Sequence, residues 1–168
     1  MGTTSREIRR IKNVFIDDCK FDNMVVILNR ITLADNVIDR MKTLLKETKK
    51  HNLEYGFDIC RKNDNLIMRN ECHGTICSIE LPRGCELDEK LVGDYHTHPR
   101  GTSLLSSSDM HVACKLDFSC IGSRYKKHEN IICHVKRPNV NVSDCREDAI
   151  EKGADIMADK YFKKINIL

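Results

Sequence analysis

The sequence predicts a single domain of the α/β or α+β class, in which helices alternate with several strands. The chain has 168 residues, a length typical of one domain. Two long segments carry apolar residues at helical spacing, and short runs rich in β-branched or aromatic residues lie between them. We expect residues 1–22 to be an N-terminal extension and residues 23–168 to form the domain.

The first strand and the first helix are expected directly after the extension. The run from Met24 to Leu28 is apolar and rich in β-branched residues, which predicts a buried strand. A helix is expected from about Leu33 to Lys50, with Thr32 as its N-cap and two lysines at its C-terminal end. Its core-facing residues should be Leu33, Val37, Ile38, Met41, Leu44 and Leu45.

The later elements are shorter and are punctuated by glycine and proline. Strands are expected over residues 54–60, 66–69, 76–81 and 91–95, of which the last leads directly into His96. A helix over residues 107–118 and strands over residues 119–122 and 131–135 should follow. A final helix is expected over residues 146–163, with one face formed by Ile150, Ala154, Met157 and Tyr161.

The composition argues against nucleic-acid and membrane partners. The net charge is only +3, and the basic residues occur as short pairs spread along the chain, whereas nucleic-acid-binding domains cluster them. The longest apolar run, Met24 to Leu28, is far too short to span a membrane, and the N-terminal residues lack the apolar segment of a signal peptide. We therefore expect a cytoplasmic protein that binds neither nucleic acid nor membrane.

The nine cysteines show no local pairing pattern. None of them are spaced as Cys-x-x-Cys, which argues against a zinc ribbon or a thioredoxin-like motif. A domain of this length and hydrophobicity also needs no disulfide scaffold. We expect buried, reduced thiols.

One short segment concentrates metal-binding chemistry. His96 and His98 lie at the end of an expected strand, where alternation places both side chains on the same face. Pro99 ends the strand, and Asp109 follows near the start of an expected helix. Two imidazoles and a carboxylate leave a fourth position for water, which is the pattern of a catalytic zinc site.

Each of these residues also has an ordinary structural interpretation. Ser106 and Asp109 fit a capping box at a helix N-terminus. The two histidines, taken alone, fit hydrogen-bonded or surface residues. The capping and ligand roles are compatible, because one helix start can present both groups to a cleft.

The motif resembles that of a known family. His96-Thr97-His98-Pro99, followed after six residues by Ser106-x-x-Asp109, resembles the signature of the JAMM/MPN+ zinc metalloproteases, which include prokaryotic JAB-like proteins. The resemblance covers about residues 24–135. It implies a single MPN/JAB-like domain of cytidine-deaminase-like architecture, in which a central mixed β-sheet is flanked by helices.

The resemblance also implies a role for each site residue. His96, His98 and Asp109 would bind one catalytic Zn²⁺. The family's upstream glutamate, which lies close to a glycine, matches Glu54 and would act as the general base, although Glu47, Glu71 and Glu80 are alternatives. Ser106 would donate a hydrogen bond to the oxyanion.

The substrates implied by the family are ubiquitin-like or sulfur-carrier proteins, cut at the isopeptide or peptide bond that follows their extended C-terminal tail. Such a deubiquitinase-like activity has three rivals: a RadC-like protein, a non-catalytic MPN-type binding module, and a PHP-type metal phosphoesterase. The last rests on Asp94-x-His96-x-His98, which resembles that family's opening motif. Only about 70 residues follow His98, whereas a β/α barrel needs about 250.

A second, structural zinc site is a further hypothesis. His111 and Cys114 lie just after Asp109, and Cys120, Cys133 or His134 would complete the ligand set. The alternative is a solvent-facing histidine beside buried thiols.

Overall fold

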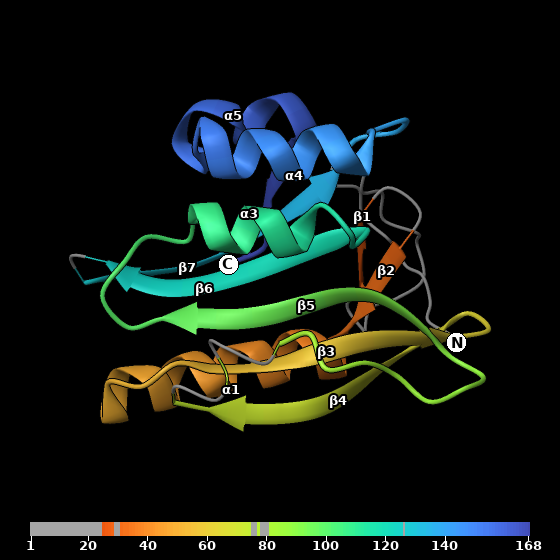
Figure 1. Ribbon diagram of the computed structural model, residues 1–168. Coiled ribbons are helices and arrows are strands. Elements are labelled where there is room, and N and C mark those ends of the chain that lie inside the picture. Colours follow the sequence, from red (N-terminus) through yellow and green to blue (C-terminus); the bar gives the residue numbers. More distant parts are fainter. Residues whose placement is uncertain (1–24, 29–30, 75–76, 78–80, 126) are drawn as a thin grey trace.

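The computed structural model describes residues 25–28, 31–74, 77, 81–125 and 127–168 (Figure 1). It has an α+β fold built on a mixed six-stranded sheet with helices, as the sequence predicts. The expected boundary between extension and domain lies outside the described residues, so it stays a prediction.

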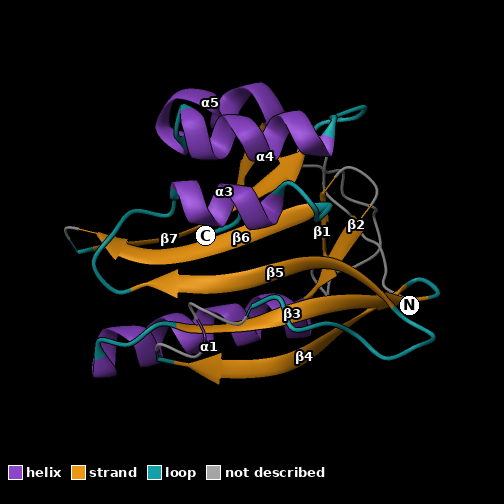
Figure 2. Ribbon diagram, viewed as in Figure 1, coloured by secondary structure: helices purple, strands orange, loops and turns teal. Residues whose placement is uncertain are grey.

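Helices and groups of strands follow one another along the chain, and Figure 2 distinguishes them by colour. The strands are β1 (Val25–Leu28), β2 (Ile31–Ala34), β3 (Tyr55–Lys62), β4 (Asn65–His73), β5 (Lys90–His98), β6 (Phe118–Tyr125), β7 (His128–Lys136) and β8 (Phe162–Asn166). The helices are α1 (Asp35–His51), α3 (Ser107–Ala113), α4 (Val142–Glu151) and α5 (Ala154–Tyr161). None of these helices is long and apolar enough to cross a membrane.

The main sheet has the strand order β4-β3-β5-β6-β7-β8. Only β5 and β6 run parallel to each other, while the other neighbouring pairs are antiparallel. Strands β1 and β2 form a separate antiparallel hairpin that leads into α1. Because β5 and β6 are parallel, the chain must cross over between them, and that crossover contains α3.

Two apolar clusters hold the layers together. Helix α1 packs on β3, β5 and β6, and its expected core-facing residues are all buried. Helices α3, α4 and α5 pack against one another and enclose a second cluster that includes Met110, Ile121, Ala149 and Phe162. The C-terminal end of β5 is thereby placed next to α3 (Figure 1).

The start of α1 differs from the prediction. Strand β2 occupies residues 31–34 and pairs with β1, so Thr32 is a strand residue and Ala34 is the N-cap. Leu33 is buried as expected, although it belongs to the strand. The C-terminal end was predicted correctly, with Lys49 and Lys50 in the last turn.

The two later helical predictions were too long. Helix α3 ends at Ala113, and Phe118 begins β6, where it pairs with Gly93 of β5. The expected final helix is two helices and a strand, because Gly153 adopts a positive φ of 89° between α4 and α5. Ile150 is consequently 70% exposed, whereas Ala154 and Tyr161 are buried as expected.

The strand expected over residues 76–81 lies mostly outside the described residues. Leu81 is described and belongs to no strand. The remaining expected strands are confirmed as β1, β3, β4, β5, β6 and β7, and the largest difference is at β4, which ends at His73 instead of residue 69. Met24 of the first expected strand is not among the described residues.

The prediction of reduced cysteines was wrong for six residues. Cys60–Cys85, Cys114–Cys145 and Cys120–Cys133 are disulfides, and Cys72 and Cys77 are buried free thiols. The fold brings these partners together across 25, 31 and 13 residues of sequence. Such long-range pairings leave no spacing pattern in the sequence.

Candidate metal centre

Strand β5 carries both histidines of the motif at its C-terminal end. His96 pairs with Gly56 of β3 on one side and with Ile121 of β6 on the other. The intervening Thr97 points to the opposite face, where its hydroxyl is hydrogen-bonded to Thr48 of α1 and accepts the backbone N–H of Tyr55 at 2.9 Å. The strand end is therefore fixed by neighbours on both sides and by α1 beneath it.

Helix α3 supplies the carboxylate through its first turn. Ser106 is the N-cap, and its Oγ accepts the backbone N–H of Asp109 at 3.1 Å. Asp109 Oδ2 in return accepts the backbone N–H of Ser106 at 3.0 Å, which completes the capping box. The box orients the carboxylate toward β5, so the expected capping and ligand roles are both present.

The side chains of the three predicted ligands converge on one point. Nε2 of His96 lies 3.1 Å from Nε2 of His98 and 3.1 Å from Asp109 Oδ1. Nε2 of His98 lies 3.1 Å from Asp109 Oδ2. Ligand atoms on a tetrahedral zinc at 2.0–2.1 Å would be separated by about 3.3 Å. The spacing therefore fits a single small cation.

The hydrogen bonding of His98 supports the same conclusion. Its Nδ1 lies 2.7 Å from the backbone carbonyl oxygen of Thr102, which can only accept a hydrogen bond. Nδ1 must therefore carry the hydrogen, which leaves the Nε2 lone pair free for a metal. A carbonyl acceptor behind a ligating imidazole is the usual support for a metal-bound histidine.

The electrostatics of the cluster favour a cation. Burial acts to raise the pKa of Asp109, but the hydrogen bonds and charges of the two histidines hold that pKa well below its usual range. Burial likewise acts to lower the pKa of His96, yet Asp109, Asp94 and Glu54 together raise it to about 9. Without a metal, the neighbouring carboxylates hold a proton on the buried His96 imidazole, and a bound cation would take the place of that positive charge.

Glu54 lies beside this cluster without joining it. It immediately precedes β3 and lines the same cavity of about 480 Å³. Burial raises its pKa, against the opposing charges of His96 and His98. Its carboxylate does not belong to the group formed by His96, His98 and Asp109, whose ligand atoms all lie within 4.8 Å of one another. A half-buried carboxylate at this position suits a proton carrier better than a fourth ligand.

The other candidate glutamates are placed elsewhere. Glu47 is partly exposed on α1 and pairs with His51, while Glu71 is exposed and pairs with Arg40. Glu80 lies outside the described residues. Among the described candidates, Glu54 is the glutamate that lines the cavity.

Ser106 also lines the cavity. Its oxygen accepts from the Asp109 N–H and lies 3.3 Å from Ser108 Oγ. Either serine can be the donor in the Ser106–Ser108 contact, and when Ser108 donates, Ser106 keeps its one proton for a ligand in the cavity.

Asp94 is a cavity residue to which the sequence interpretation gave no role in the metal centre. It lies two residues before His96 on the same face of β5 and is 4% exposed. Its Oδ1 accepts the Ser119 hydroxyl at 2.5 Å, and burial raises its pKa to about 6. The alternating Asp-x-His-x-His pattern shows the shared face, whereas the burial depends on the neighbouring strands.

The hypothesis of a second zinc site is contradicted. Cys114, Cys120 and Cys133 are all in disulfides and offer no thiolate. His111 instead contacts Arg146, whose Nε lies 3.1 Å from His111 Nε2. His134 is buried in β7, where its Nδ1 faces the carbonyl oxygen of Ser119.

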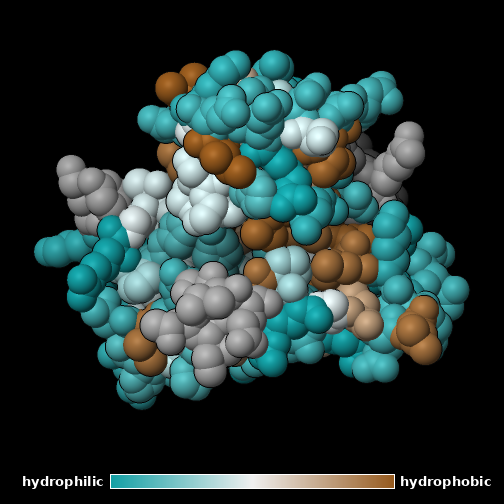
Figure 3. All heavy atoms as spheres, viewed as in Figure 1, coloured by the Kyte–Doolittle hydropathy of each residue, from teal (hydrophilic) through white to brown (hydrophobic). Residues whose placement is uncertain are grey.

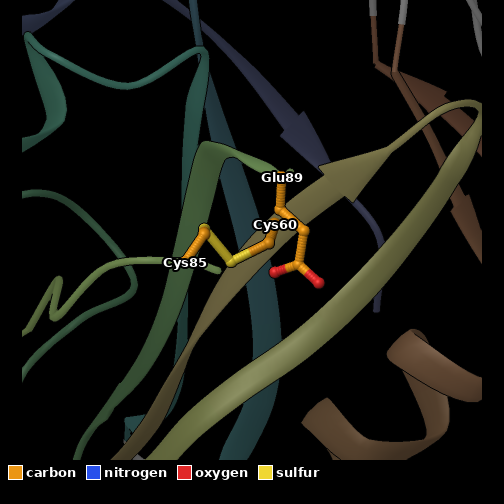
Figure 4. Close-up of side chains that lie close together, drawn as sticks. All are labelled: Cys60, Cys85 and Glu89. Atoms are coloured by element: carbon orange, nitrogen blue, oxygen red, sulfur yellow. A yellow bond between two sulfur atoms is a disulfide. The ribbon is translucent and has the colours of Figure 1, made fainter. Parts of the chain in front are cut away.

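A different cysteine cluster also fails as a metal site. Cys60, Cys85 and Glu89 lie close together, but Figure 4 shows the two sulfurs bonded to each other. Glu89 forms a two-point ion pair with Arg69. Within the described residues, the remaining group of potential ligands is His96, His98 and Asp109.

The fold also excludes the phosphoesterase alternative. A PHP-type enzyme would require a β/α barrel. The described strands instead form an open, mixed six-stranded sheet and a separate hairpin. The Asp94-x-His96-x-His98 pattern therefore has another explanation in this protein.

No protein-family model and no curated protein matches the sequence. The structure is similar to that of a JAB1/MPN domain protein from Archaeoglobus fulgidus, at 22% sequence identity and a TM-score of 0.37. The match covers 56% of this chain and 82% of the archaeal protein.

Proposed function

We propose that this protein is a zinc-dependent metallopeptidase of the JAMM/MPN+ type. The observation that carries the proposal is the convergence of His96, His98 and Asp109 at 3.1 Å, with Glu54 and Ser106 lining the same cavity. These are the ligands, proton carrier and oxyanion donor that amide hydrolysis requires. The match between the motif and the three-dimensional cluster supports the proposal independently of any comparison.

The residues divide the chemical work among them. Zinc, when bound, supplies a Lewis acid and lowers the pKa of a coordinated water toward neutrality. Glu54, whose pKa is raised by burial, takes a proton from the attacking water and delivers it to the leaving amine. The Ser106 hydroxyl donates to the substrate's carbonyl oxygen as negative charge develops there. The Thr102 carbonyl keeps His98 in the tautomer that leaves Nε2 available.

The substrate class follows from the resemblance of the motif. We propose cleavage of a peptide or isopeptide bond after the extended C-terminal tail of a ubiquitin-like or sulfur-carrier protein. An extended tail can dock as an added strand, in which main-chain hydrogen bonds give affinity. A RadC-like protein or a non-catalytic binding module would share the fold without this cleavage.

The direct test is hydrolysis of a ubiquitin-like protein fused through its C-terminus to a reporter. We expect cleavage by the zinc-loaded protein and a loss of at least about 100-fold in kcat for Glu54→Gln, because the proton carrier is removed. Glu47→Gln is the matched control, since Glu47 is a partly exposed glutamate of α1 that does not line the cavity.

Two outcomes of this test would count against the proposal, one against the role of Glu54 and one against peptidase activity. Equal rates for both variants would contradict the role of Glu54. Zinc binding without cleavage of any ubiquitin-like or sulfur-carrier fusion would favour the binding-module alternative.

A further inference from the structure

Two buried thiols lie beside the candidate metal centre. Six of the eight described cysteines form disulfides, and Cys72 and Cys77 remain free. Both are buried, and their thiol groups are hydrogen-bonded to each other. The described part of the chain therefore pairs every other cysteine and holds the last two in contact.

The sheet register places Cys72 close to the metal ligands. Cys72 of β4 pairs with Gly56 of β3, and Gly56 pairs with His96 of β5. Residues paired across neighbouring strands direct their side chains to the same face. Cys72 and His96 thus lie on one face, on either side of a glycine.

The missing side chain of Gly56 provides the space that Cys77 occupies. A Cβ atom at this position would lie 2.9 Å from Cys77 Sγ and 2.8 Å from Leu81 Cδ1. Cys77 and Leu81 also line the cavity that contains Glu54 and His96. The Cys77 sulfur therefore lies over Gly56 and forms part of the wall of the metal cavity.

We propose that Cys72 and Cys77 are a redox-active pair that a low-molecular-weight disulfide, such as oxidised glutathione, converts into a fourth disulfide that fixes this wall. One cysteine thiolate attacks the oxidant, forms a mixed disulfide and releases one glutathione thiol. The second cysteine thiolate then displaces the second glutathione. The protein loses two electrons and two protons, and the oxidant is reduced to two thiols.

The surroundings of Cys72 and Cys77 determine the rate of their thiol–disulfide exchange. Burial raises the pKa of both thiols, and the charges of Glu54 and Asp94 add to the effect at Cys77. The thiolate is the attacking species, so exchange is slower than at an exposed cysteine. The pair responds to sustained oxidation rather than to a brief pulse.

The disulfide restricts access to the cavity. In the reduced protein a weak thiol hydrogen bond holds Cys77 to β4, whereas a disulfide holds it covalently. Because Cys77 and Leu81 line the cavity, we expect fixing Cys77 to restrict the movement of this part of its wall. We expect zinc to transfer to a chelator several-fold more slowly from the oxidised protein.

The disulfide itself is tested by peptide mapping in a Cys19→Ser background. Trypsin releases residues 70–83 as one peptide that contains Cys72, Cys77 and no other cysteine. After exposure to oxidised glutathione, this peptide should be lighter by two hydrogens and resistant to alkylation. Two alkylated cysteines, or two glutathione adducts, would overturn the proposal.

Access is tested by zinc transfer to a chelator from the reduced and the oxidised protein, with Cys72→Ser as the matched variant. The variant keeps Cys77 but cannot form the disulfide, so its two transfer rates should be equal. If the protein that keeps both cysteines transfers zinc equally fast when reduced and when oxidised, despite a mapped disulfide, the proposed control of access to the cavity is overturned. A protein that holds no zinc in either state would contradict the proposed metal centre, and the mapping would still decide the disulfide.

Discussion

At the scale of single residues, His96 links metal binding to pH. Burial acts to lower its pKa, but the hydrogen bond and charge of Asp109, with the charges of Asp94 and Glu54, raise that pKa to about 9. A metal needs the Nε2 lone pair, which a proton also uses. Zinc and a proton therefore compete for the same nitrogen over the whole neutral range.

The first prediction concerns this competition. Below pH 9, His96 is protonated in the metal-free protein, so zinc affinity should fall as the pH falls, by roughly tenfold per pH unit. Competition with a coloured chelator at pH 6, 7 and 8 measures the slope. An affinity that does not change over this range would show that no protonated histidine needs to be displaced.

His134 connects a single residue to the stability of the domain. It is 1% exposed, and burial lowers its pKa to about 4 from the ordinary 6.5. Between these values the unfolded chain binds the proton and the folded protein does not, so the free energy of unfolding decreases as the pH falls. The shift corresponds to a loss on the order of 3 kcal/mol.

The second prediction is that His134→Gln removes this acid sensitivity between pH 6.5 and pH 4. Asp94, whose pKa is raised to about 6, acts in the opposite direction, but it is present in both proteins. Urea unfolding of the metal-free proteins at several pH values isolates the difference. Parallel stability curves for the two proteins would contradict a neutral, buried His134.

At the scale of elements, β5 is clamped between α1 and β6. The Tyr95 hydroxyl donates to the backbone carbonyl oxygen of Met41 in α1 at 2.8 Å. Gly122 of β6 leaves the space for this hydroxyl, because a Cβ atom there would overlap it. The clamp acts on the strand that carries both histidines, directly before His96.

The third prediction compares two changes to this clamp. Tyr95→Phe should lower the free energy of unfolding by about 1 kcal/mol through the lost hydrogen bond. Gly122→Ala should lower it by about 1–3 kcal/mol, because the new methyl group displaces the tyrosine ring. Denaturant unfolding measures both. An unchanged stability in Gly122→Ala would show that the ring moves freely.

At the scale of the whole molecule, the Cys114–Cys145 disulfide joins the end of α3 to α4. It belongs to the cluster that holds the three C-terminal helices together. Because α3 also carries Asp109, this cross-link connects the packing of the second layer to the metal centre. The molecular surface in Figure 3 is largely hydrophilic over these helices, with scattered apolar residues.

The fourth prediction is that the double variant Cys114→Ala/Cys145→Ala loses about 2–4 kcal/mol of stability, the effect expected for a loop of this length. Its zinc affinity should also fall, since α3 is held less firmly. Cys60→Ala/Cys85→Ala is the control for loss of a disulfide that joins other elements. An equal fall in zinc affinity in both variants would rule out a specific effect through α3.

The sequence predicted those features of the molecule that depend on residues close together in the chain. His96, His98 and Asp109 lie within 14 residues, so alternation and one helix start suffice to bring them together. The alternation of strands with helices and the apolar face of α1 could also be predicted from local patterns in the sequence. Glu54 required the resemblance, because its place beside His96 depends on the pairing of β3 with β5.

The errors arose where distant segments decide the structure. Residues 162–166 resemble the end of a helix, but they pair with β7 and form β8. Gly153, which has a positive φ, separates α4 from α5 before them. The disulfides depend on elements that meet only in the folded protein. Of these features, the break between α4 and α5 has a local signal in Gly153, which the predicted helix over residues 146–163 ran through.

The zinc content of the purified protein tests the central claim most directly. Elemental mass spectrometry should find about one zinc per chain, with little or none in Asp109→Ala and an unchanged value in Asp155→Ala, another aspartate from the first turn of a helix. A wild-type protein that takes up no zinc after exposure to the metal, or an Asp109→Ala variant that keeps its zinc, would contradict the metal centre on which the proposed function depends.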